Sequence, residues 1–561
     1  MKFIILYVLS IMFLVMSCTD LDLNPLSEGS SETWYSNETE ISMAVNDLFR
    51  TAFWPTYSDN WTDDYTNREL TTPITNGTIN GEWGTVTSVW QNSYKAISRA
   101  NTVLSNLEEV ENIPQSTLDK FVGNAYFIRA SQYSRLIFLY GDVIFYQGVI
   151  DITEAFTMAQ TDKNQILEEI YNDYDLAISK LPISYGNNEL NLATKGAALA
   201  MKARIALQMQ DWAVARDAAK ECIDLGVYEL HPDFEELFLT RTKNPNELLF
   251  GIPRSREYNV VWGVRDHLPR NPGGWGGAQA PSWDLFSSFL CEDGLPIDVS
   301  PLYNPRMPFE NRDPRCTATI VEFQTPHLGY IYQPHPDSIQ VLNVNTGNYQ
   351  ANNDTRSVAQ FASFNGLLWK KGVDEDWLPN YQAENDIMIM RYADVLLMYA
   401  EAKIELGELD ETVLEAINKV RARAYKVNFD DTSAYPAVTS TSQEELRSTI
   451  RIERRMEFAF EGRRYEDIIR WRIAEEVLNN DIYGMLDVAE LRTKVIQPGL
   501  WFFPMTPQID ENGTPNLEPM YEAGLCRRLA IRSFDPEKQY LWPIPTKEIL
   551  INDNLDQNPG Y

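Results

Sequence analysis

The chain has 561 residues, of which 44% are hydrophobic and 12% aromatic, so it can bury a large core and is not composed like a disordered protein. Its formal net charge of −32 repels phosphate backbones, and no run of Lys and Arg offsets it, which excludes nucleic acid as an expected partner. The same field disfavours polyanionic ligands unless the fold builds a local basic pocket. Solubility alone also accounts for such acidity.

The amino terminus has the pattern of an export signal. Lys2 precedes an apolar run over residues 3–16, and Ser17 and Cys18 follow it. The run is too short for a spanning helix, which needs about 20 apolar residues. A small residue directly before Cys resembles the lipobox of bacterial lipoproteins, in which the Cys becomes the first residue and carries acyl chains such as palmitate. The alternative is an ordinary secretory signal followed by a chance Cys.

Residues 1–17 are therefore expected to be a lipoprotein signal peptide, with Cys18 the lipidation site and 18–40 a lipidated tether. The start of the tether, residues 19–25, is acidic and turn-prone and resembles the surface-export signal of lipoproteins sent to the outer leaflet. Two or more acyl chains hold a protein stably on a membrane. The expected location is the outer membrane, facing the extracellular side.

Residues 41–231 carry successive amphipathic patterns with the helical period, typical of an N-terminal helical scaffold. The last two are joined by a very short turn, so they should pack antiparallel, and the first of them is rich in Ala at close-packing positions. A ligand-side loop is expected near 55–88. The predicted helices cover 41–53, 89–107, 118–140, 164–181, 195–209 and 212–225.

A second hairpin of the same kind is predicted from helices over 389–406 and 411–424, joined at 407–410. Such pairs resemble tetratricopeptide hairpins, here at irregular intervals. No apolar run beyond the amino terminus approaches spanning length. Residues 386–561 are therefore expected to form a C-terminal helical scaffold and a closing segment.

Between the two scaffolds, residues 232–385 are dense in turn formers, with an Asn-Pro-Gly-Gly-Trp-Gly-Gly run at 271–277. Brief strands are predicted over 247–252 and 317–323. The expected fold class is mainly α: a tetratricopeptide-like helical hairpin scaffold with a loop-rich α+β ligand-binding insertion. Loops held by a rigid frame commonly carry binding specificity.

Catalytic chemistry has little support in the sequence. The four His lie outside any HExxH motif or GxSxG elbow, and no Asp-rich loop has EF-hand spacing. A pair of glycosidase carboxylates is defined in space, so the sequence does not decide that point. Four Cys remain at positions 222, 291, 316 and 526 without metal-like spacing, and either a Cys291–Cys316 disulfide or free buried thiols fit them. No catalytic residue, metal or cofactor is expected.

Several segments, in this order along the chain, resemble the SusD/RagB-like family of outer-membrane nutrient-binding lipoproteins. They include a helix that ends in Leu-Tyr-Gly-Asp, an Arg-Tyr-Ala-Asp-Val-Leu-Leu run and a closing Asn-Pro-Gly-Tyr. The resemblance extends from Cys18 to Tyr561. The matching segments are 124–142, 391–402, 417–424, 453–472, 540–549 and 558–561.

The resemblance implies four tetratricopeptide-like helix pairs with a ligand-binding subdomain on the opposite side. It also implies a partner, a SusC-like TonB-dependent transporter, to which the family passes oligosaccharides captured at the cell surface. The charged residues of the matching segments are interpreted as helix-face ion pairs rather than a reactive cluster. They are Arg454, Glu457, Arg463, Arg464 and Asp467.

Sugar recognition needs flat aromatic faces together with amide, carboxylate or Arg groups for hydroxyls. Gly on both sides of Trp275 leaves its ring little to pack on locally, and Gly-Trp-Gly stretches in the family border the ligand site. Trp283 lies close behind it, and Trp369 and Trp377 are further candidates in the insertion. By resemblance of position, the loop after the first helix adds Asp63, Asp64, Asn67, Arg68 and Trp83. The alternative is that Trp61 and Trp83 only pack this loop onto the frame.

The sequence thus predicts a non-enzymatic surface lipoprotein that binds an oligosaccharide or polysaccharide, of neutral or weakly charged kind, and passes it to the transporter. A different possibility is a structural lid, or a peptide- or protein-binding helical scaffold without glycan affinity. A third is a surface glycoside hydrolase, for which helical hairpins are not a usual frame.

Overall fold

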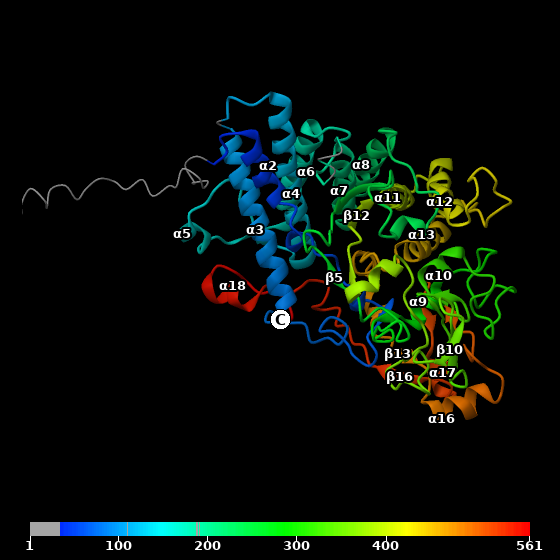
Figure 1. Ribbon diagram of the computed structural model, residues 1–561. Coiled ribbons are helices and arrows are strands. Elements are labelled where there is room, and N and C mark those ends of the chain that lie inside the picture. Colours follow the sequence, from blue (N-terminus) through cyan, green and yellow to red (C-terminus); the bar gives the residue numbers. More distant parts are fainter. Residues whose placement is uncertain (1–33, 109, 187–188, 190) are drawn as a thin grey trace, which may run out of the picture.

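The computed structural model describes residues 34–108, 110–186, 189 and 191–561. The export signal, Cys18 and most of the tether lie outside these residues. Helices gather in one part of the molecule, and short strands and loops in the other (Figure 1). Among the described residues, no helix combines the length and apolar character that crossing a bilayer requires.

The helical frame contains both predicted hairpin regions. Helix α11 packs against α8 as well as α12 and α13, so the N-terminal and C-terminal helices form one continuous body. Its main helices are α2 (Glu38–Asp47), α3 (Gly84–Leu107), α4 (Gln115–Tyr140), α6 (Lys163–Lys180), α7 (Lys195–Gln208), α8 (Trp212–Asp224), α11 (Tyr392–Leu406), α12 (Glu411–Ala424), α13 (Gln443–Phe458) and α14 (Arg464–Arg470).

Local sequence fixes the ends of these helices. Thr194 caps α7, since its Oγ1 accepts a hydrogen bond from the Ala197 amide at 3.1 Å. The Asp211 carboxylate caps α8 in the same way. Helix α11 ends at Gly407, whose φ of 74° is the left-handed conformation that glycine adopts most easily. The predicted helices in 41–231 are confirmed to within a few residues, except that the first ends at Asp47 and a short 3-10 turn, Thr51–Phe53, follows it.

Two predicted boundaries are wrong. Residues 389–391 end strand β12 (Ile387–Arg391), which pairs with β4 (Leu248–Ile252), and the helix begins only at Tyr392. The apolar run suits a strand as well as a helix, and its distant partner decides. Of the strand predicted over 317–323, residues 317–319 instead end helix α10 (Pro314–Thr319), which Asp313 caps and Pro314 opens, and only Ile320 makes a β-bridge, with Trp369.

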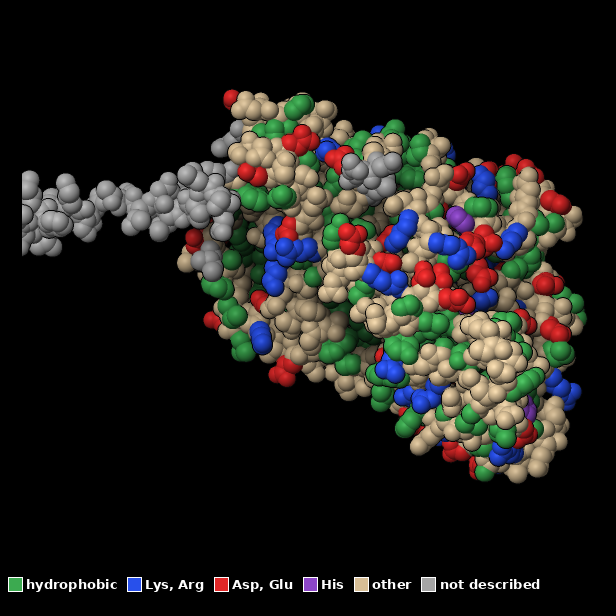
Figure 2. Space-filling view, in the orientation of Figure 1, with side chains coloured by type: hydrophobic (Ala, Val, Ile, Leu, Met, Phe, Trp, Pro, Cys, Tyr) green, Lys and Arg blue, Asp and Glu red, His purple; other side chains and the backbone are tan. Residues whose placement is uncertain are grey.

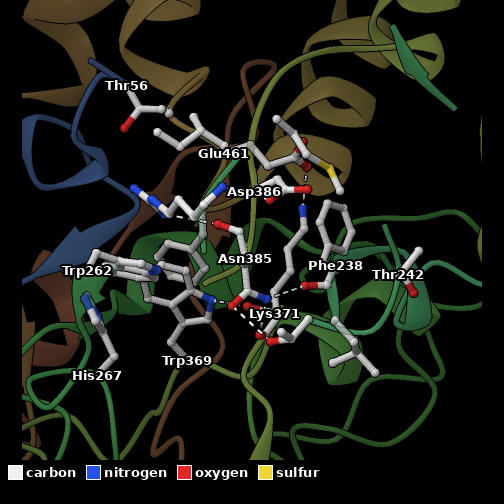
Figure 3. Close-up of a pocket in the computed structure, with 18 of the residues that line it drawn as sticks. Thr56, Phe238, Thr242, Trp262, His267, Trp369, Lys371, Asn385, Asp386 and Glu461 are labelled. Carbon is white, nitrogen blue, oxygen red and sulfur yellow. Dashed lines mark hydrogen bonds and ion pairs between the residues drawn. The ribbon is translucent and has the colours of Figure 1, made fainter. Parts of the chain in front are cut away.

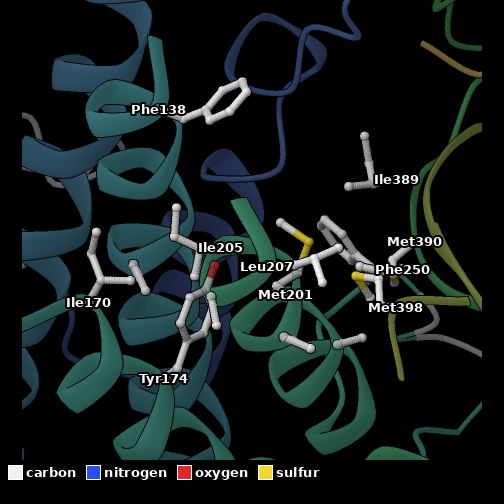
Figure 4. Close-up of a cluster of buried hydrophobic side chains, with 14 of the residues drawn as sticks. Phe138, Ile170, Tyr174, Met201, Ile205, Leu207, Phe250, Ile389, Met390 and Met398 are labelled. Carbon is white, nitrogen blue, oxygen red and sulfur yellow. The ribbon is translucent and has the colours of Figure 1, made fainter. Parts of the chain in front are cut away.

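The core of the frame is apolar and closely packed. In Figure 4, side chains of α4, α6, α7 and α11 meet those of the β4–β12 ribbon, among them Tyr174, Met201, Phe250 and Met390. All four are buried. The ribbon that leads into and out of the insertion is therefore part of the frame's core, which fixes the base of the insertion.

The loop-rich part has its own aromatic core. Trp283 and Phe286 of helix α9 (Trp283–Ser288) pack with Phe502 and Phe503 from the C-terminal segment. The strands here form small antiparallel sheets. They are β1 (Tyr65–Thr66) with β6 (Ala280–Pro281), β5 (Trp262–Gly263) with β11 (Gln382–Ala383), β13 (Ile482–Gly484) with β16 (Arg527–Ala530), β14 (Gln508–Ile509) with β15 (Pro515–Asn516), and β7 (Pro326–His327), β8 (Tyr330–Ile331), β9 (Gln340–Asn343) and β10 (Asn348–Ala351) in one sheet.

Helix α13 joins the frame to the loop-rich part through buried ion pairs. Glu457 binds Arg391 at 2.6 Å, Arg315 at 3.1 Å and also Arg423. These partners come from the end of β12, from α10 in the insertion and from α12. Arg454 of the same helix binds Asp394 at 2.8 Å and Asp467 at 3.0 Å.

The expected ion pairs are therefore present, but most of them cross between elements instead of following one helix face. Only pairs such as Asp467–Arg470, at 2.7 Å, join residues three apart on one helix. Burial alone would raise the pKa of Glu457, but Arg423, Arg391 and Arg315 outweigh burial and lower it to about 2. Glu457 therefore stays ionised in the folded protein at neutral pH.

Replacing Glu457 by Gln should lower the free energy of unfolding at pH 7 by about 3–5 kcal/mol, because buried guanidinium groups lose their counter-charge. The contribution of Glu457 is complete above its ordinary pKa of 4.5 and is lost as pH falls through about 2. The difference in the free energy of unfolding between wild type and variant, measured by chemical denaturation, should thus become smaller as pH is lowered from 5 to 2.

Lys220→Ala is the matched control, since it removes a pair with Asp224 whose side chains are 47% and 57% exposed. Its effect should stay within about 0.5 kcal/mol. Equal losses in the two variants would contradict a structural role for the buried network.

Candidate functional site

The two loops nominated from the sequence lie side by side. Strand β1 pairs with β6, so Tyr65 stands opposite Pro281 and Thr66 opposite Ala280. The Ser282 amide also donates to the Asp64 carbonyl at 3.1 Å. Residues more than 200 positions apart in the sequence thus contribute to one surface.

Asp63 and Asp64 lie inside the protein, with 0% exposure. Arg464 donates hydrogen bonds to both carboxylate oxygens of Asp63 at 2.9 Å, and Arg455 forms ion pairs with Asp63 at 2.7 Å and with Asp64 at 2.6 Å. Burial alone would raise the pKa of Asp63, but Arg455 and Arg464 hold it well below its usual range. The structure corrects the expectation that this pair faces a ligand: both carboxylates tie the loop to α13 and α14.

Two of the predicted tryptophans also pack inside. Trp283 is 1% exposed, and its Nε1 donates to the Asn365 carbonyl at 2.9 Å. Trp83 is half-buried, with its ring 5.8 Å from both the Trp61 and the Trp542 ring. These placements correct the expectation for Trp283, and for Trp83 they favour the alternative, in which it packs the loop onto the frame.

Trp275 is at the surface, with 48% of its area exposed. Its loop folds back on the segment before it, since the Trp275 amide donates to the Arg265 carbonyl at 2.9 Å. Gly276 has a φ of 75°, and a Cβ there would lie 2.5 Å from the Arg270 side chain. Glycine is therefore needed beside Trp275 for the turn and for the close approach of Arg270.

Arg68 connects the two loops at this surface. Its Nη2 donates to the Trp275 carbonyl at 2.7 Å and to the Phe361 carbonyl at 3.3 Å, and its guanidinium carbon lies 5.2 Å from the centre of the Phe361 ring. Arg265 lies 5.6 Å from the Trp275 ring and 4.7 Å from the Tyr381 ring. We call this set the Trp275 surface: Arg68, Arg265, Arg270, Trp275, Phe361 and Tyr381.

Of the predicted residues, Arg68 and Trp275 are thus brought together. Asn67 is half-buried next to Arg68 and pairs through its backbone with Leu70. Sequence reasoning missed Arg265, Phe361 and Tyr381. Phe361 is 49% exposed and sits in a turn-rich stretch, but nothing in its local pattern shows that it lies beside Trp275.

A pocket of about 340 Å³ lies between the frame and the insertion (Figure 3). Aromatic side chains line it, including Trp262, Trp369 and Phe460, and Trp369 stacks on Phe460 at 4.6 Å. Trp377 also borders it, although it is 2% exposed.

Most polar groups of the pocket are bound to each other. Lys371 pairs with Glu461 at 2.6 Å, Lys243 pairs with Asp386 at 2.7 Å, and Asn385 Oδ1 accepts a hydrogen bond from Trp377 Nε1 at 2.8 Å. Asp59 Oδ1, Trp262 Nε1 and His267 Nδ1 have no partner, but all three atoms are covered by neighbouring atoms. A ligand entering from solvent would therefore find few free groups here.

Among the described residues, no group of three or more His, Cys, Asp and Glu side chains is placed to hold a metal ion. The four described cysteines are free and buried, which settles the open question of the disulfide for these positions. Burial lowers the pKa of His267 and of His327 to about 3, so both are neutral at physiological pH. On the face shown in Figure 2, acidic and basic side chains intermingle.

The buried carboxyl group of Asp59, which lines the pocket, allows a test of the electrostatics of the pocket. Burial, with Asp64 nearby, raises its pKa from 3.8 to about 7. A raised carboxyl pKa means that the folded form binds the proton more tightly, so wild-type stability falls as pH rises from about 4 to about 7. Asp59→Asn removes this pH-dependent loss of stability. Its free energy of unfolding should exceed that of wild type by roughly 1 kcal/mol or more at pH 8, and by less at pH 5. Thermal denaturation at the two pH values checks this, and a pH-independent difference would contradict it.

The architecture defines a class of protein: a frame of tetratricopeptide-like helical hairpins that holds a loop-rich insertion with an exposed aromatic surface. The family model described as "SusD family" matches residues 250–561, which is more than half of the chain. A second model, described as "Starch-binding associating with outer membrane", matches residues 26–207. The chain belongs to the SusD family, which confirms the resemblance seen in its sequence.

Individual relatives agree with this assignment. The chain is 25% identical to SusD-like protein P2 of Formosa agariphila, over 100% of both chains. It resembles the crystal structure of a SusD-like carbohydrate binding protein from Bacteroides fragilis, with 27% identity, a TM-score of 0.76, and coverage of 93% of this chain and 100% of that one. A laminarin binding SusD-like protein shares the fold at 18% identity and a TM-score of 0.64, over 94% of this chain and 100% of that one.

Proposed function

We propose that this protein binds an oligosaccharide or polysaccharide at the cell surface and passes it to a SusC-like TonB-dependent transporter without cleaving it. The observation that carries the proposal is the Trp275 surface. There, two half-exposed rings, Trp275 and Phe361, lie beside arginines with free donors. Aromatic faces take the C–H side of a sugar ring, and the guanidinium groups take hydroxyl oxygens.

The Trp275 surface suits this role better than the pocket. Its rings are open to solvent, while the polar groups of the pocket are largely bound to one another. Arg68 also anchors both loops to each other, so the platform is held in place before a ligand arrives. The SusD-like carbohydrate binding relative from Bacteroides fragilis supports a carbohydrate as the ligand.

Anchoring and delivery are parts of the same proposal. The outer-membrane description of the model matching residues 26–207 supports a place on that membrane, and the lipobox-like sequence that ends at Cys18 supports a lipid anchor. A large ligand held on an anchored protein stays close to a transporter in the same membrane, which raises its effective concentration there. A lid or scaffold without glycan affinity remains the competing function.

Trp275→Ala should weaken glycan binding at least about tenfold, because the ring supplies a large apolar face to the sugar. The measurement is a glycan array, followed by calorimetry on its hits, with the soluble chain lacking residues 1–18. Phe156→Ala is the matched control, since Phe156 is also 48% exposed but follows α5 (Ile152–Ala155) on the frame. Undiminished binding by the Trp275 variant would move the site elsewhere, and a folded protein that binds no glycan would favour the lid.

Cys18→Ser should move the protein from the membrane fraction to the soluble fraction of cells, because the hydroxyl cannot replace the thiol that carries an acyl chain. Metabolic labelling with a fatty acid provides a second readout and should be lost in the variant. Ser17→Ala keeps a small residue before the Cys and serves as the control. Retained labelling in the Cys18 variant would refute the lipid anchor.

A further inference from the structure

Three arginines of the Trp275 surface lack an acidic partner. Among the described residues, no Asp or Glu forms an ion pair with Arg68, Arg265 or Arg270. This is unexpected in a chain with 80 acidic and 48 basic residues. In the frame, by contrast, buried arginines such as Arg391 and Arg454 each bind two or more carboxylates.

The donors of these arginines are mostly unused. Arg265 gives only its Nε, to the Gly273 carbonyl at 3.1 Å. Arg68 uses Nη2 for two carbonyl groups. No hydrogen bond to another described residue is formed by any guanidinium nitrogen of Arg270. Its Nε is buried, whereas its Nη1 and Nη2 are open to solvent. Backbone carbonyls orient the guanidinium groups but leave their charge unbalanced.

The arginines also repel one another. Burial, followed by the charge of Arg270, lowers the pKa of Arg68, although Asp266 opposes this shift. Asp354, the other nearby acid, is held by the backbone amides of Arg270 and Asn271 rather than by a guanidinium, and burial raises its pKa to about 6. Neither acid forms an ion pair with these guanidinium groups, and a bound anion would relieve the repulsion between them.

Positive charge continues beyond Arg68 around the Phe364 ring. Arg356 lies 4.6 Å and Arg527 5.4 Å from its centre. Both pair with Asp487, whose side chain is 65% exposed, and Arg527 also pairs with Glu69, whose side chain is 52% exposed. Such exposed pairs are weak and easily exchanged for another anion. The basic strip is thus longer than one charged group needs, which suits a chain with repeated charges.

We propose that the Trp275 surface recognises an anionic glycan, one that carries carboxylate or sulfate ester groups on its sugars. This inference rests on the proposed function and names its substrate class. Arg matches both groups through paired N–H donors, while Trp275 and Phe361 stack on the rings between them. It also revises the expectation of a neutral ligand, because the local basic surface that such an anion requires is present.

The test is an array of polysaccharides that includes carboxylated, sulfated and neutral members, probed with the soluble chain in low salt. The expected hits are anionic, and their binding should weaken as NaCl is raised, because salt screens exposed charges. A carboxyl-reduced or desulfated form of each hit should bind at least about tenfold more weakly. Binding confined to neutral members overturns the inference but leaves the proposed function intact, whereas no binding to any member removes both.

Variants then test whether the anionic groups of the glycan bind at the Trp275 surface. Arg265→Gln should weaken binding of the anionic hit about tenfold and weaken binding of its neutral derivative much less, because a hydroxyl oxygen gains less from a guanidinium group than an anion does. Arg50→Gln removes an arginine whose side chain is 59% exposed on the frame and should change neither. Trp275→Ala should weaken both forms. Two outcomes would overturn the inference. In the first, Arg265→Gln weakens binding of the charged and neutral forms equally. In the second, Arg50→Gln weakens binding of the charged form as much as Arg265→Gln does.

Discussion

The buried ion pairs of helix α13 are the constraint on which the rest of the structure depends. Glu457 holds the end of β12, helix α10 and helix α12, while Arg454 holds α11 and α14. Arg455 of the same helix holds the loop at Asp63 and Asp64. A single helix thus binds the strand that follows the insertion, helix α10 within the insertion and the loop at Asp63 and Asp64. Buried charges tolerate only well-placed partners, so this arrangement specifies the relative position of frame and loops as well as their stability.

The contrast between the two groups of arginines links this frame to function. Inside, carboxylates balance guanidinium groups such as those of Arg391 and Arg454, although the buried Arg312 binds only carbonyl groups. At the Trp275 surface, carbonyl groups hold Arg68 and Arg265 in place without neutralising them. The protein as a whole is strongly acidic, so its net charge repels an anion at a distance, and the local basic surface attracts the anion only at short range. This favours a ligand that also gains from contact with Trp275 and Phe361.

Much of the fold was predictable because its signals are local. Helical periodicity, the Thr194 and Asp211 caps and the Gly407 terminus give the helices, and the matching segments give the family. Where a distant partner decides, local signals failed: 389–391 form a strand because β4 lies beside them. Site residues were harder. Trp275 was found through its glycine neighbours. Asp63 and Asp64 are residue types that often bind ligands, but they serve the frame, since Arg455 and Arg464 bind them from 391 to 401 residues away.

The sequence by itself determined the export pattern, the helical hairpins, the loop-rich insertion and the family, because each depends on residues close together in the chain. Only the tertiary structure decided which polar residues are paired inside and which remain free outside. It joined Arg68 to Trp275 through the β1–β6 pairing and placed Arg265, Phe361 and Tyr381 beside them. The physical reason is that the availability of a charge depends on its neighbours in space, and for this site those neighbours come from segments that are hundreds of residues apart.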